Sequence, residues 1–402
     1  MPLSRDTRLL FVTRVVRMFA YGFLAVVLVL YLAAIGLDDR EIGALLSLTL
    51  AGDVLVSLYL TTRADAIGRR RTLIGGALLM IGAAIVFAST NVFLLLVIAA
   101  TIGVISPSGN EVGPFLAVEQ VALAQTASRD GRTTLFAWYN LAGSFATATG
   151  ALAAGFMAST LQHAGFTAAS SYRAAIYAYG LLGILLAIGF ARLTPAVEGA
   201  PRELHVRSLF QIHRSRSIIV RLSALFALDS FAGGLVVQSI VAYWFYRRFG
   251  LTPAALGSIF FGANLVAGFS GLLAARIARR IGLLNTMVFT HLPSNLLLIL
   301  VPFMPTLPLA IGVLLLRFSI SQMDVPTRQA FVIAAVDESE RTAAAGITGV
   351  ARTTGAALAP IVAMPLIASL THQWVPFVVA GGLKVVYDLA LLWSCRNVEL
   401  EG

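Results

Sequence analysis

Charged side chains are scarce in this chain. Asp, Glu, Lys and Arg make up only 12% of its 402 residues, whereas 58% of the residues are hydrophobic. A soluble domain carries about 25% charged residues, so this composition predicts a protein that resides in lipid. Cysteine is rarer still, and the single Cys395 excludes a disulfide within the chain and a metal site built from cysteines.

Catalytic and cofactor-binding motifs are also missing. The sequence contains no phosphate-binding loop, no nucleophile elbow and no paired metal-ligand histidines. These absences argue against an enzyme, a resident metal or cofactor, and the hydrolysis of ATP. The energy for any transport would then come from a gradient of ions or of the substrate.

Long apolar runs dominate what is present. A helix needs about 20 apolar residues to cross a bilayer core, and twelve runs reach that length. The predicted spans are 8–34, 41–61, 72–90, 92–122, 133–158, 172–193, 217–246, 253–275, 284–304, 306–335, 342–370 and 374–395. The longest charged connection, 194–216, is interpreted as a linker between an N-terminal half, 1–193, and a C-terminal half, 217–402.

The arginines predict the orientation of these spans. In the loops and at the ends of the spans, nineteen arginines fall on one side of the membrane and four on the other, and short loops rich in arginine stay in the cytoplasm. We therefore expect a protein of the plasma membrane whose two termini and linker lie in the cytoplasm. Because the arginines lie in these loops, the net charge of +10 does not predict nucleic-acid binding.

The two halves resemble each other at a fixed offset of 214 positions. Ile67-Gly68 corresponds to Ile281-Gly282, and the same offset places Gly36-Leu37 on Gly250-Leu251. A register shared from Gly36 to Gly68 indicates two homologous halves in the same orientation. This is the parallel repeat found in one class of transporters.

The loop between the second and third spans carries a family resemblance. Asp65-x-x-Gly68-Arg69-Arg70-Arg71 is similar to the signature loop of the major facilitator superfamily, and a degenerate copy follows span eight. The match departs from the pattern at Thr61, where glycine is usual, and at Ala66, where arginine often follows the acid. The chain thus resembles twelve-span bacterial members, and no subfamily is identified.

The resemblance implies a fold and a mode of action. We expect an all-α membrane protein of two six-helix bundles related by a pseudo-twofold axis, which moves a small molecule by alternating access. It would be a monomer surrounded by lipid, and either a symporter or an antiporter. At the cytoplasmic gate, Asp65 would cap span eleven near Thr342, with Gly68 in the same loop, and Arg69 would pair with Glu119.

Ionisable residues inside the spans are the candidates for a site, because charges at membrane depth usually face a cavity or a partner. Near the midplane we expect Arg17, Asp53, Glu111, Asp229, Asp324 and Arg352. They would line the transport pathway or form salt bridges between helices, and these readings are compatible. Lys384 and Asp388, four apart on span twelve, are expected to pair with each other, and His291 to be a satisfied buried histidine rather than a proton carrier.

Two spans contain helix-breaking residues beside these charges. Span four holds prolines and glycines around Asn110 and Glu111, and span ten holds a matching stretch with Asp324 and Arg328. Backbone broken at membrane depth is tolerated where it lines a cavity, so these stretches predict a binding site. Trp138, Tyr139 and Asn140 on span five suit an organic substrate, or else form an aromatic pair that faces the interface.

These patterns favour a proton-coupled transporter of a small organic solute. A carboxylate near the midplane can be protonated in one state and paired with an arginine in another, which suits Glu111, Asp324, Asp53 and Asp229. The first alternative is a proton-independent facilitator or exchanger of an anionic solute held by Arg17 and Arg352. The second is a membrane receptor that binds a solute without moving it.

The arginine distribution makes a direct prediction of topology. Single cysteines introduced into the loop 62–71 and the linker 194–216, on a background in which Cys395 is replaced, should be protected from an impermeant thiol reagent added outside intact cells. Cysteines introduced beside Arg40 or Arg173 should react. Labelling of the linker from outside would contradict the orientation.

Overall fold

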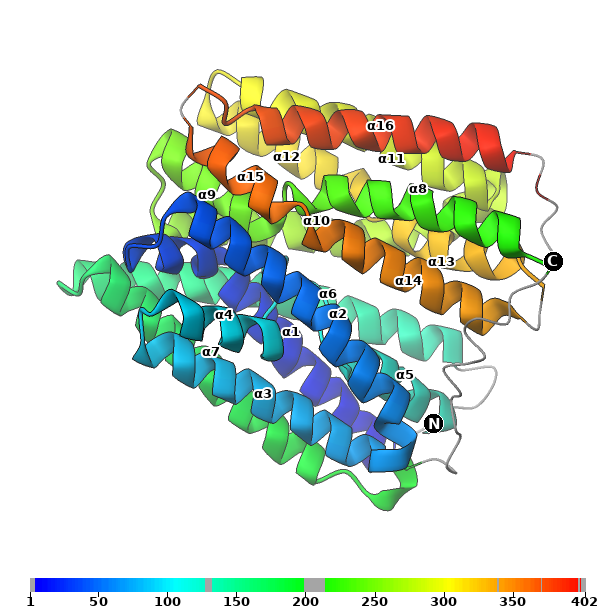
Figure 1. The fold of residues 1–402 in the computed structure, drawn as a ribbon, viewed down its shortest axis with the longest axis horizontal. Helices are drawn as coiled ribbons and strands as arrows, with labels where there is room; N and C mark the ends of the chain where they lie inside the picture. The colour runs from blue at the N-terminus through cyan, green and yellow to red at the C-terminus, as the bar shows by residue number, and fades with distance from the viewer. Residues whose placement is uncertain are drawn as a thin grey trace. The chain divides into compact units, whose positions relative to one another are not determined.

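The structure, a computed structural model, describes most of the chain as helix. The described residues are 4–126, 132–198, 214–337, 340–369, 371–396 and 398, and at positions 65, 124–126, 132–134, 275 and 342 the backbone alone is described. All regular structure within them is helical, as predicted (Figure 1). Among them, 11 helical segments are long and apolar enough to cross a membrane. The remaining predicted span, span four (92–122), is divided into two shorter helices.

The chain separates into two compact units. Unit 1 holds the described residues of 1–204 together with 238–261, and unit 2 holds those of 205–237 and 262–402. Residues 238–261 of the predicted C-terminal half therefore belong to unit 1. The division into halves at the linker stays a prediction, and residues 199–213 of that linker lie outside the described part of the chain.

Unit 1 is built mainly from the first seven helices. These are α1 (Arg5–Ala34), α2 (Asp39–Ile67), α3 (Arg69–Ser89), α4 (Phe93–Ile102), α5 (Phe115–Thr126), α6 (Arg132–His163) and α7 (Ala168–Ala191), followed by the short helix η2 (Pro195–Val197) and joined by α9 (Gln238–Phe249). The main packing pairs are α1 with α6 and α7, α3 with α7, and α2 with α4.

Unit 2 repeats this packing. It contains α8 (Arg216–Gly234), most of α10 (Pro253–Ile281), α11 (Leu283–Leu300), η4 (Val301–Phe303), α12 (Leu307–Ser321), α13 (Asp324–Ala334), α14 (Arg341–Ala357), α15 (Pro360–Ala368) and α16 (Val375–Cys395). Here α8 packs on α14 and α11 packs on α16, the counterparts of α1 on α6 and α3 on α7 (Figure 1).

Repeated glycines mark equivalent turns in the two halves. Helices α2 and α10 each have 29 residues and are followed by Gly68 and Gly282, whose φ angles are 102° and 86°. Gly36 after α1 and Gly250 after α9 have φ angles of 94° and 64°. Residues with a side chain rarely adopt such backbone angles. Glycine at these positions therefore ends the helix sharply and allows the next helix to begin soon after it.

Glycine also sets the distance between crossing helices. A Cβ atom placed on Gly150 of α6 would lie 2.0 Å from the carbonyl oxygen of Phe19 on α1. In unit 2, a Cβ on Gly355 of α14 would lie 2.2 Å from the carbonyl oxygen of Ala227 on α8. Small residues let membrane helices approach this closely.

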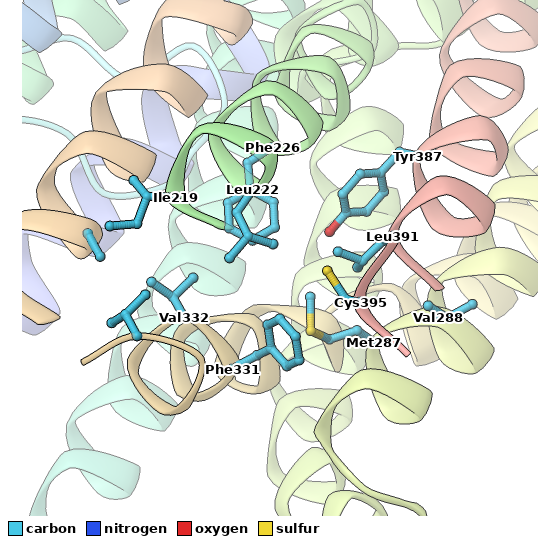
Figure 2. Close-up of a cluster of buried hydrophobic side chains, with 12 residues drawn as sticks. Ile219, Leu222, Phe226, Met287, Val288, Phe331, Val332, Tyr387, Leu391 and Cys395 are labelled. Atoms are coloured by element: carbon cyan, nitrogen blue, oxygen red, sulfur yellow. The ribbon is translucent and has the colours of Figure 1, made fainter. Parts of the chain in front are cut away.

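An apolar cluster fills the end of unit 2 at which α8 begins and α16 ends (Figure 2). Its fully buried members include Leu222 and Phe226 of α8, Phe331 of α13, and Tyr387 and Leu391 of α16. Lipid tails are as apolar as these side chains, so the cluster stabilises unit 2 through close packing rather than through removal from water.

The close crossing of α1 and α6 can be tested by adding one methyl group. Gly150→Ala should lower the melting temperature of the purified protein, because the new Cβ meets backbone that cannot rotate away, and such overpacking costs about 1–3 kcal/mol. Gly75→Ala on α3 is the matched control, since no atom lies within 4 Å of its added Cβ. Equal melting temperatures for the two variants would contradict the close crossing.

Candidate functional site

The break in span four is stabilised by side chains from other helices. The segment 103–114 between α4 and α5 is not helical, and Gly109 and Gly113 have φ angles of 71° and 78°. The Tyr179 hydroxyl donates to the Val104 carbonyl at 2.5 Å, and the Tyr21 hydroxyl donates to the Val112 carbonyl at 3.1 Å. Broken backbone at membrane depth must be satisfied within the protein, and these tyrosines do so.

Asp53 of α2 holds the same segment through a backbone amide. Its Oδ1 accepts a 2.6 Å hydrogen bond from the Gly113 N–H and a 3.1 Å bond from the Ser57 hydroxyl. Within the described part of the chain this carboxylate has no ion pair. Asp53 therefore joins α2 to the broken span through hydrogen bonds to neutral groups and not through a salt bridge.

Two arginines and two glutamates form an ion cluster next to the break. Arg17 donates to both carboxylate oxygens of Glu119, at 2.7 and 2.6 Å, and to Glu111 Oε1 at 3.1 Å. Arg14, one turn before Arg17 on α1, contacts the same Glu111 oxygen. Glu119 also accepts from the Tyr139 hydroxyl and, at 3.4 Å, from Thr13. The cluster joins α1, the broken span and α6.

The prediction that Arg69 pairs with Glu119 is wrong, because the described residues show no contact between these two side chains. Glu119 is fully buried, and its oxygens are occupied by Arg17, Tyr139 and Thr13. The Arg69 guanidinium donates instead to the Val197 carbonyl at 3.3 Å. Arg17 on α1 forms a bidentate pair of hydrogen bonds with Glu119, and such pairs are among the strongest between an arginine and a carboxylate. The loop arginine therefore has a stronger competitor for Glu119, which the sequence pattern did not indicate.

Glu198 occupies the start of α3 next to the signature loop. Its carboxylate accepts the backbone N–H groups of Arg69 and Arg70 at 2.7 and 3.1 Å. A carboxylate at a helix N-terminus is favoured by the helix dipole, so Glu198 ties η2 to α3. The side chains of Asp65 and Thr342 lie outside the described structure, and the expected cap between them stays a prediction.

The three polar residues of span five point in different directions. Tyr139 is fully buried within the ion cluster, whereas the Trp138 side chain is 62% exposed and Asn140 is also exposed. Asn110, at the break of span four, is exposed as well. Trp138 and Tyr139 therefore do not act as an aromatic pair, and Tyr139 contributes its hydroxyl to Glu119.

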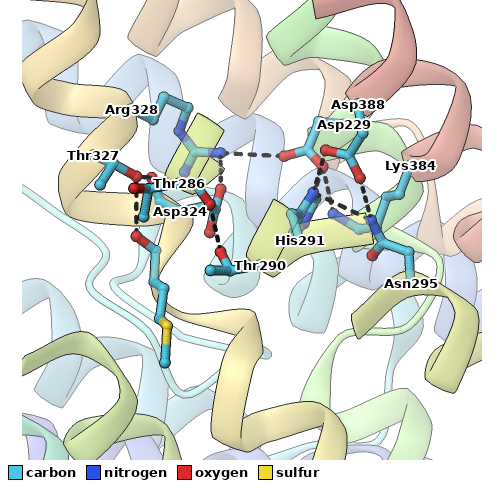
Figure 3. A network of polar contacts seen from close by, with 11 residues as sticks. Asp229, Thr286, Thr290, His291, Asn295, Asp324, Thr327, Arg328, Lys384 and Asp388 are labelled. Carbon is cyan, nitrogen blue, oxygen red and sulfur yellow. Dashed lines mark hydrogen bonds and ion pairs between the residues drawn. The ribbon is translucent and has the colours of Figure 1, made fainter. Parts of the chain in front are cut away.

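A larger polar network crosses unit 2 (Figure 3). Asp229 of α8 accepts from Lys384 of α16 at 2.5 Å and from Arg328 of α13 at 3.2 Å. Arg328 also donates to Asp324 at 2.9 Å, four residues before it. The break between α12 and α13 places Asp324 at the first residue of α13, which confirms the predicted interruption of span ten.

Lys384 and Asp388 do not pair with each other, so that prediction is wrong. Lys384 bonds Asp229, and Asp388 bonds His291 Nδ1 at 2.8 Å and Asn295 at 2.9 Å. Residues four apart on a helix can pair, but partners on α8 and α11 are closer here. His291 is buried and hydrogen-bonded, as predicted. Asn295 was missed, although it shares a helix face with His291 four residues earlier.

Arg352 differs from the other candidates. It makes no ion pair or hydrogen bond among the described residues, and its buried Nε has no partner. Its electrostatic neighbours are Arg328, Asp229 and Asp324 in the network, together with Tyr387. Arg317 of α12 likewise has a buried Nε without a partner. The sequence did not indicate which of the in-span charges stay without an ion pair.

The fold and these networks define a class of protein. Broken spans beside buried ion clusters, within two repeated helical units, are typical of membrane transporters. The chain belongs to the Major Facilitator Superfamily, whose family model matches residues 10–360. It is therefore a transporter of the secondary type and not an enzyme.

Individual relatives agree with this assignment. The chain is 30% identical over 429 aligned positions to the uncharacterized membrane protein YJR124C of Saccharomyces cerevisiae, covering 99% of this chain and 96% of that one. Its fold is similar to that of the nucleoside transporter NupG, with a TM-score of 0.75 and 15% identity over 97% of this chain and 99% of that one.

Two further solved structures share the fold. A D-xylose-proton symporter has a TM-score of 0.74 and 15% identity, covering 98% of both chains. The human organic anion transporter MFSD10 (TETRAN) has a TM-score of 0.63 and 17% identity, covering 96% of this chain and 99% of that one. At these identities the likeness shows the fold alone.

The corrected partner of Lys384 can be tested by a double-mutant cycle. Lys384→Gln and Asp229→Asn should each destabilise the protein, but the double variant should lose less than the sum, with a coupling of about 1 kcal/mol or more for residues in contact. Lys384→Gln with Asp388→Asn should show a smaller coupling. Thermal melting of the purified variants measures both cycles, and a larger coupling to Asp388 would restore the pair that the sequence predicted.

Proposed function

We propose that this protein is a proton-coupled transporter that moves a small organic solute across the plasma membrane by alternating access. Both termini would lie in the cytoplasm, and the protein would act as a monomer. The ion cluster around Glu111 is the observation that carries the proposal. The similar fold of a proton symporter agrees with it.

Glu111 is the member of that cluster best suited to gain and lose a proton. Its Oε1 faces both Arg14 and Arg17, while its Oε2 is buried and has no hydrogen-bond partner among the described residues. The Glu111 side chain is 16% exposed, whereas Glu119 is fully enclosed. Glu111 also lies on non-helical backbone, so it can move without breaking a helix.

Protonation of Glu111 would change the charge balance on α1. Arg17 keeps Glu119 as a partner, but Glu111 is the only carboxylate that pairs with Arg14 in the described structure. An unpaired guanidinium at membrane depth is unfavourable, so Arg14 would have to find a new partner or move. The replacement of Arg14 by a proton as the partner of Glu111 is the step that would couple proton movement to the transport cycle.

The alternative is a proton-independent exchanger of an anionic solute, and Arg352 favours it. A buried guanidinium without an ion pair can hold a carboxylate or phosphate by two parallel hydrogen bonds. Arg17, the other arginine that the sequence analysis offered for this role, is already occupied by Glu119 and Glu111. An anionic solute would therefore rest on Arg352 rather than on both arginines.

Glu111→Gln separates the two functions. In proteoliposomes it should abolish transport driven by a pH gradient while sparing exchange of substrate for substrate, because glutamine mimics the protonated acid permanently. A solute that stabilises the purified protein in a thermal screen would serve as the transported probe. Arg352→Gln should leave the proton dependence intact.

Glu119→Gln is the matched contrast to this variant. Glu119 lies on the same span as Glu111, but its hydrogen bonds hold α1 and α6 against that span. The substitution should therefore lower the melting temperature instead of changing the coupling to protons. Proton-driven transport by Glu111→Gln at the wild-type rate, with an unchanged pH profile, would remove Glu111 from the mechanism. Loss of exchange in Arg352→Gln with pH-independent wild-type transport would favour the anion exchanger.

A further inference from the structure

A groove runs between two membrane helices of unit 2, close to the end at which α8 begins and α16 ends. The two helices pack side by side (Figure 1), and the groove between them encloses about 520 Å³. Its lining has the same spacing on both helices, i, i+3 and i+4: Arg221, Ala224 and Leu225 on α8, and Ala390, Trp393 and Ser394 on α16. Residues at this spacing share one face of a helix, and the small alanine on each face leaves the groove its room.

The groove lies on the outer surface of these helices and not in the apolar core of unit 2. Leu222 and Leu391, which adjoin Arg221 and Ala390 in the chain, are fully buried in the apolar cluster (Figure 2), whereas the Trp393 side chain is 75% exposed. Both helices belong to segments long and apolar enough to cross a membrane. Apolar side chains exposed on a membrane-spanning helix contact lipid, so the groove is open to lipid molecules.

The depth of the groove matches the upper part of a phospholipid. Arg221 lies five residues after the start of α8 and Ala390 five residues before the end of α16. At 1.5 Å per residue, each is about 8 Å from the end of its helix. Trp393 lies two residues before the end of α16, and tryptophan near the end of a span sits at the level of the lipid headgroups. The groove therefore extends from the headgroups toward the acyl chains.

Arg221 is the one charged residue of the lining, and no acid of the described chain pairs with it. Its guanidinium donates to the Ser394 carbonyl at 2.8 Å, one of the last carbonyls of α16, which have no acceptor role within the helix. The acids of these two helices, Asp229 and Asp388, are buried in the polar network (Figure 3). A guanidinium has several N–H groups in a planar fork, so those not bonded to Ser394 can bind a phosphate.

We propose that this groove binds an anionic phospholipid, with its phosphate on Arg221 and an acyl chain against Ala224, Leu225, Ala390 and Trp393. The apolar lining favours a lipid over a free phosphate ion, and the unpaired arginine favours an anionic headgroup over a zwitterionic one. In the orientation that the arginines predict, the groove opens on the cytoplasmic leaflet, whose negative surface attracts basic residues. The site shares no residue with either polar network and does not depend on the proposed proton coupling.

Quenching of tryptophan fluorescence by brominated lipids tests the site. Bromine on an acyl chain quenches tryptophans close to that chain, and Trp393 is the tryptophan that lines the groove. The part of the quenching that Trp393→Phe removes therefore measures occupancy. In delipidated protein purified in detergent, brominated phosphatidylglycerol should produce it at about fivefold lower concentration than brominated phosphatidylcholine with the same chains. This factor corresponds to about 1 kcal/mol for one basic residue at a membrane surface.

Variants separate the charge of the groove from its shape. Arg221→Gln should remove the preference for phosphatidylglycerol and leave the quenching by phosphatidylcholine unchanged, whereas Arg221→Lys should retain most of the preference. Ala390→Leu, which fills the groove without changing its charge, should weaken the quenching by both lipids. Arg216→Gln is the matched control, because Arg216 is exposed at the start of the same helix and does not line the groove. It should behave like the wild type.

Three results would overturn the proposal. The first is an equal loss of preference in Arg216→Gln and Arg221→Gln, which would show a diffuse attraction to negative lipid. The second is equal quenching of the wild type by the two lipids. The third is displacement of brominated phosphatidylglycerol by inorganic phosphate but not by sodium chloride at the same ionic strength, which would show that Arg221 holds a free anion.

Discussion

The rest of this structure depends on one constraint: a charge or backbone polar group at membrane depth must find its partner within the protein. The break in span four shows it for the backbone, since Tyr21 and Tyr179 donate to the carbonyls that the missing helix leaves open. The ion clusters show it for side chains, since Arg17 takes both oxygens of Glu119. The positions of the polar side chains therefore follow from the path of the backbone.

The path itself could largely be predicted from the sequence, because it depends on local patterns. Run length predicted the spans, and the prolines and glycines around Glu111 and the proline after Asp324 predicted two interruptions. The interruptions between α8 and α9 and between α14 and α15 were missed. In the first, Gly233 and Gly234 end the helix without a proline, which is a weaker signal because glycine also occurs within membrane helices.

Partners of buried charges were predicted less well, because a partner depends on how each helix is rotated and how deep it sits. Spacing along the chain indicated that Lys384 pairs with Asp388, and this local argument ignored Asp229 on a helix more than a hundred residues away in sequence. Asp324 and Arg328 have the same spacing, and these two residues do bond each other. In both cases the i,i+4 spacing was the same, so spacing alone could not separate them.

The two halves therefore share backbone geometry but not electrostatics. Gly36 and Gly250, and Gly68 and Gly282, repeat because a turn needs the same backbone angles wherever it occurs. Nothing requires the charges to repeat, and they do not: in unit 1 two arginines face two glutamates, whereas in unit 2 a histidine, a lysine and an arginine share three aspartates. An internal repeat thus predicts where a membrane chain bends, and the chemistry of each half has to be worked out from its own contacts.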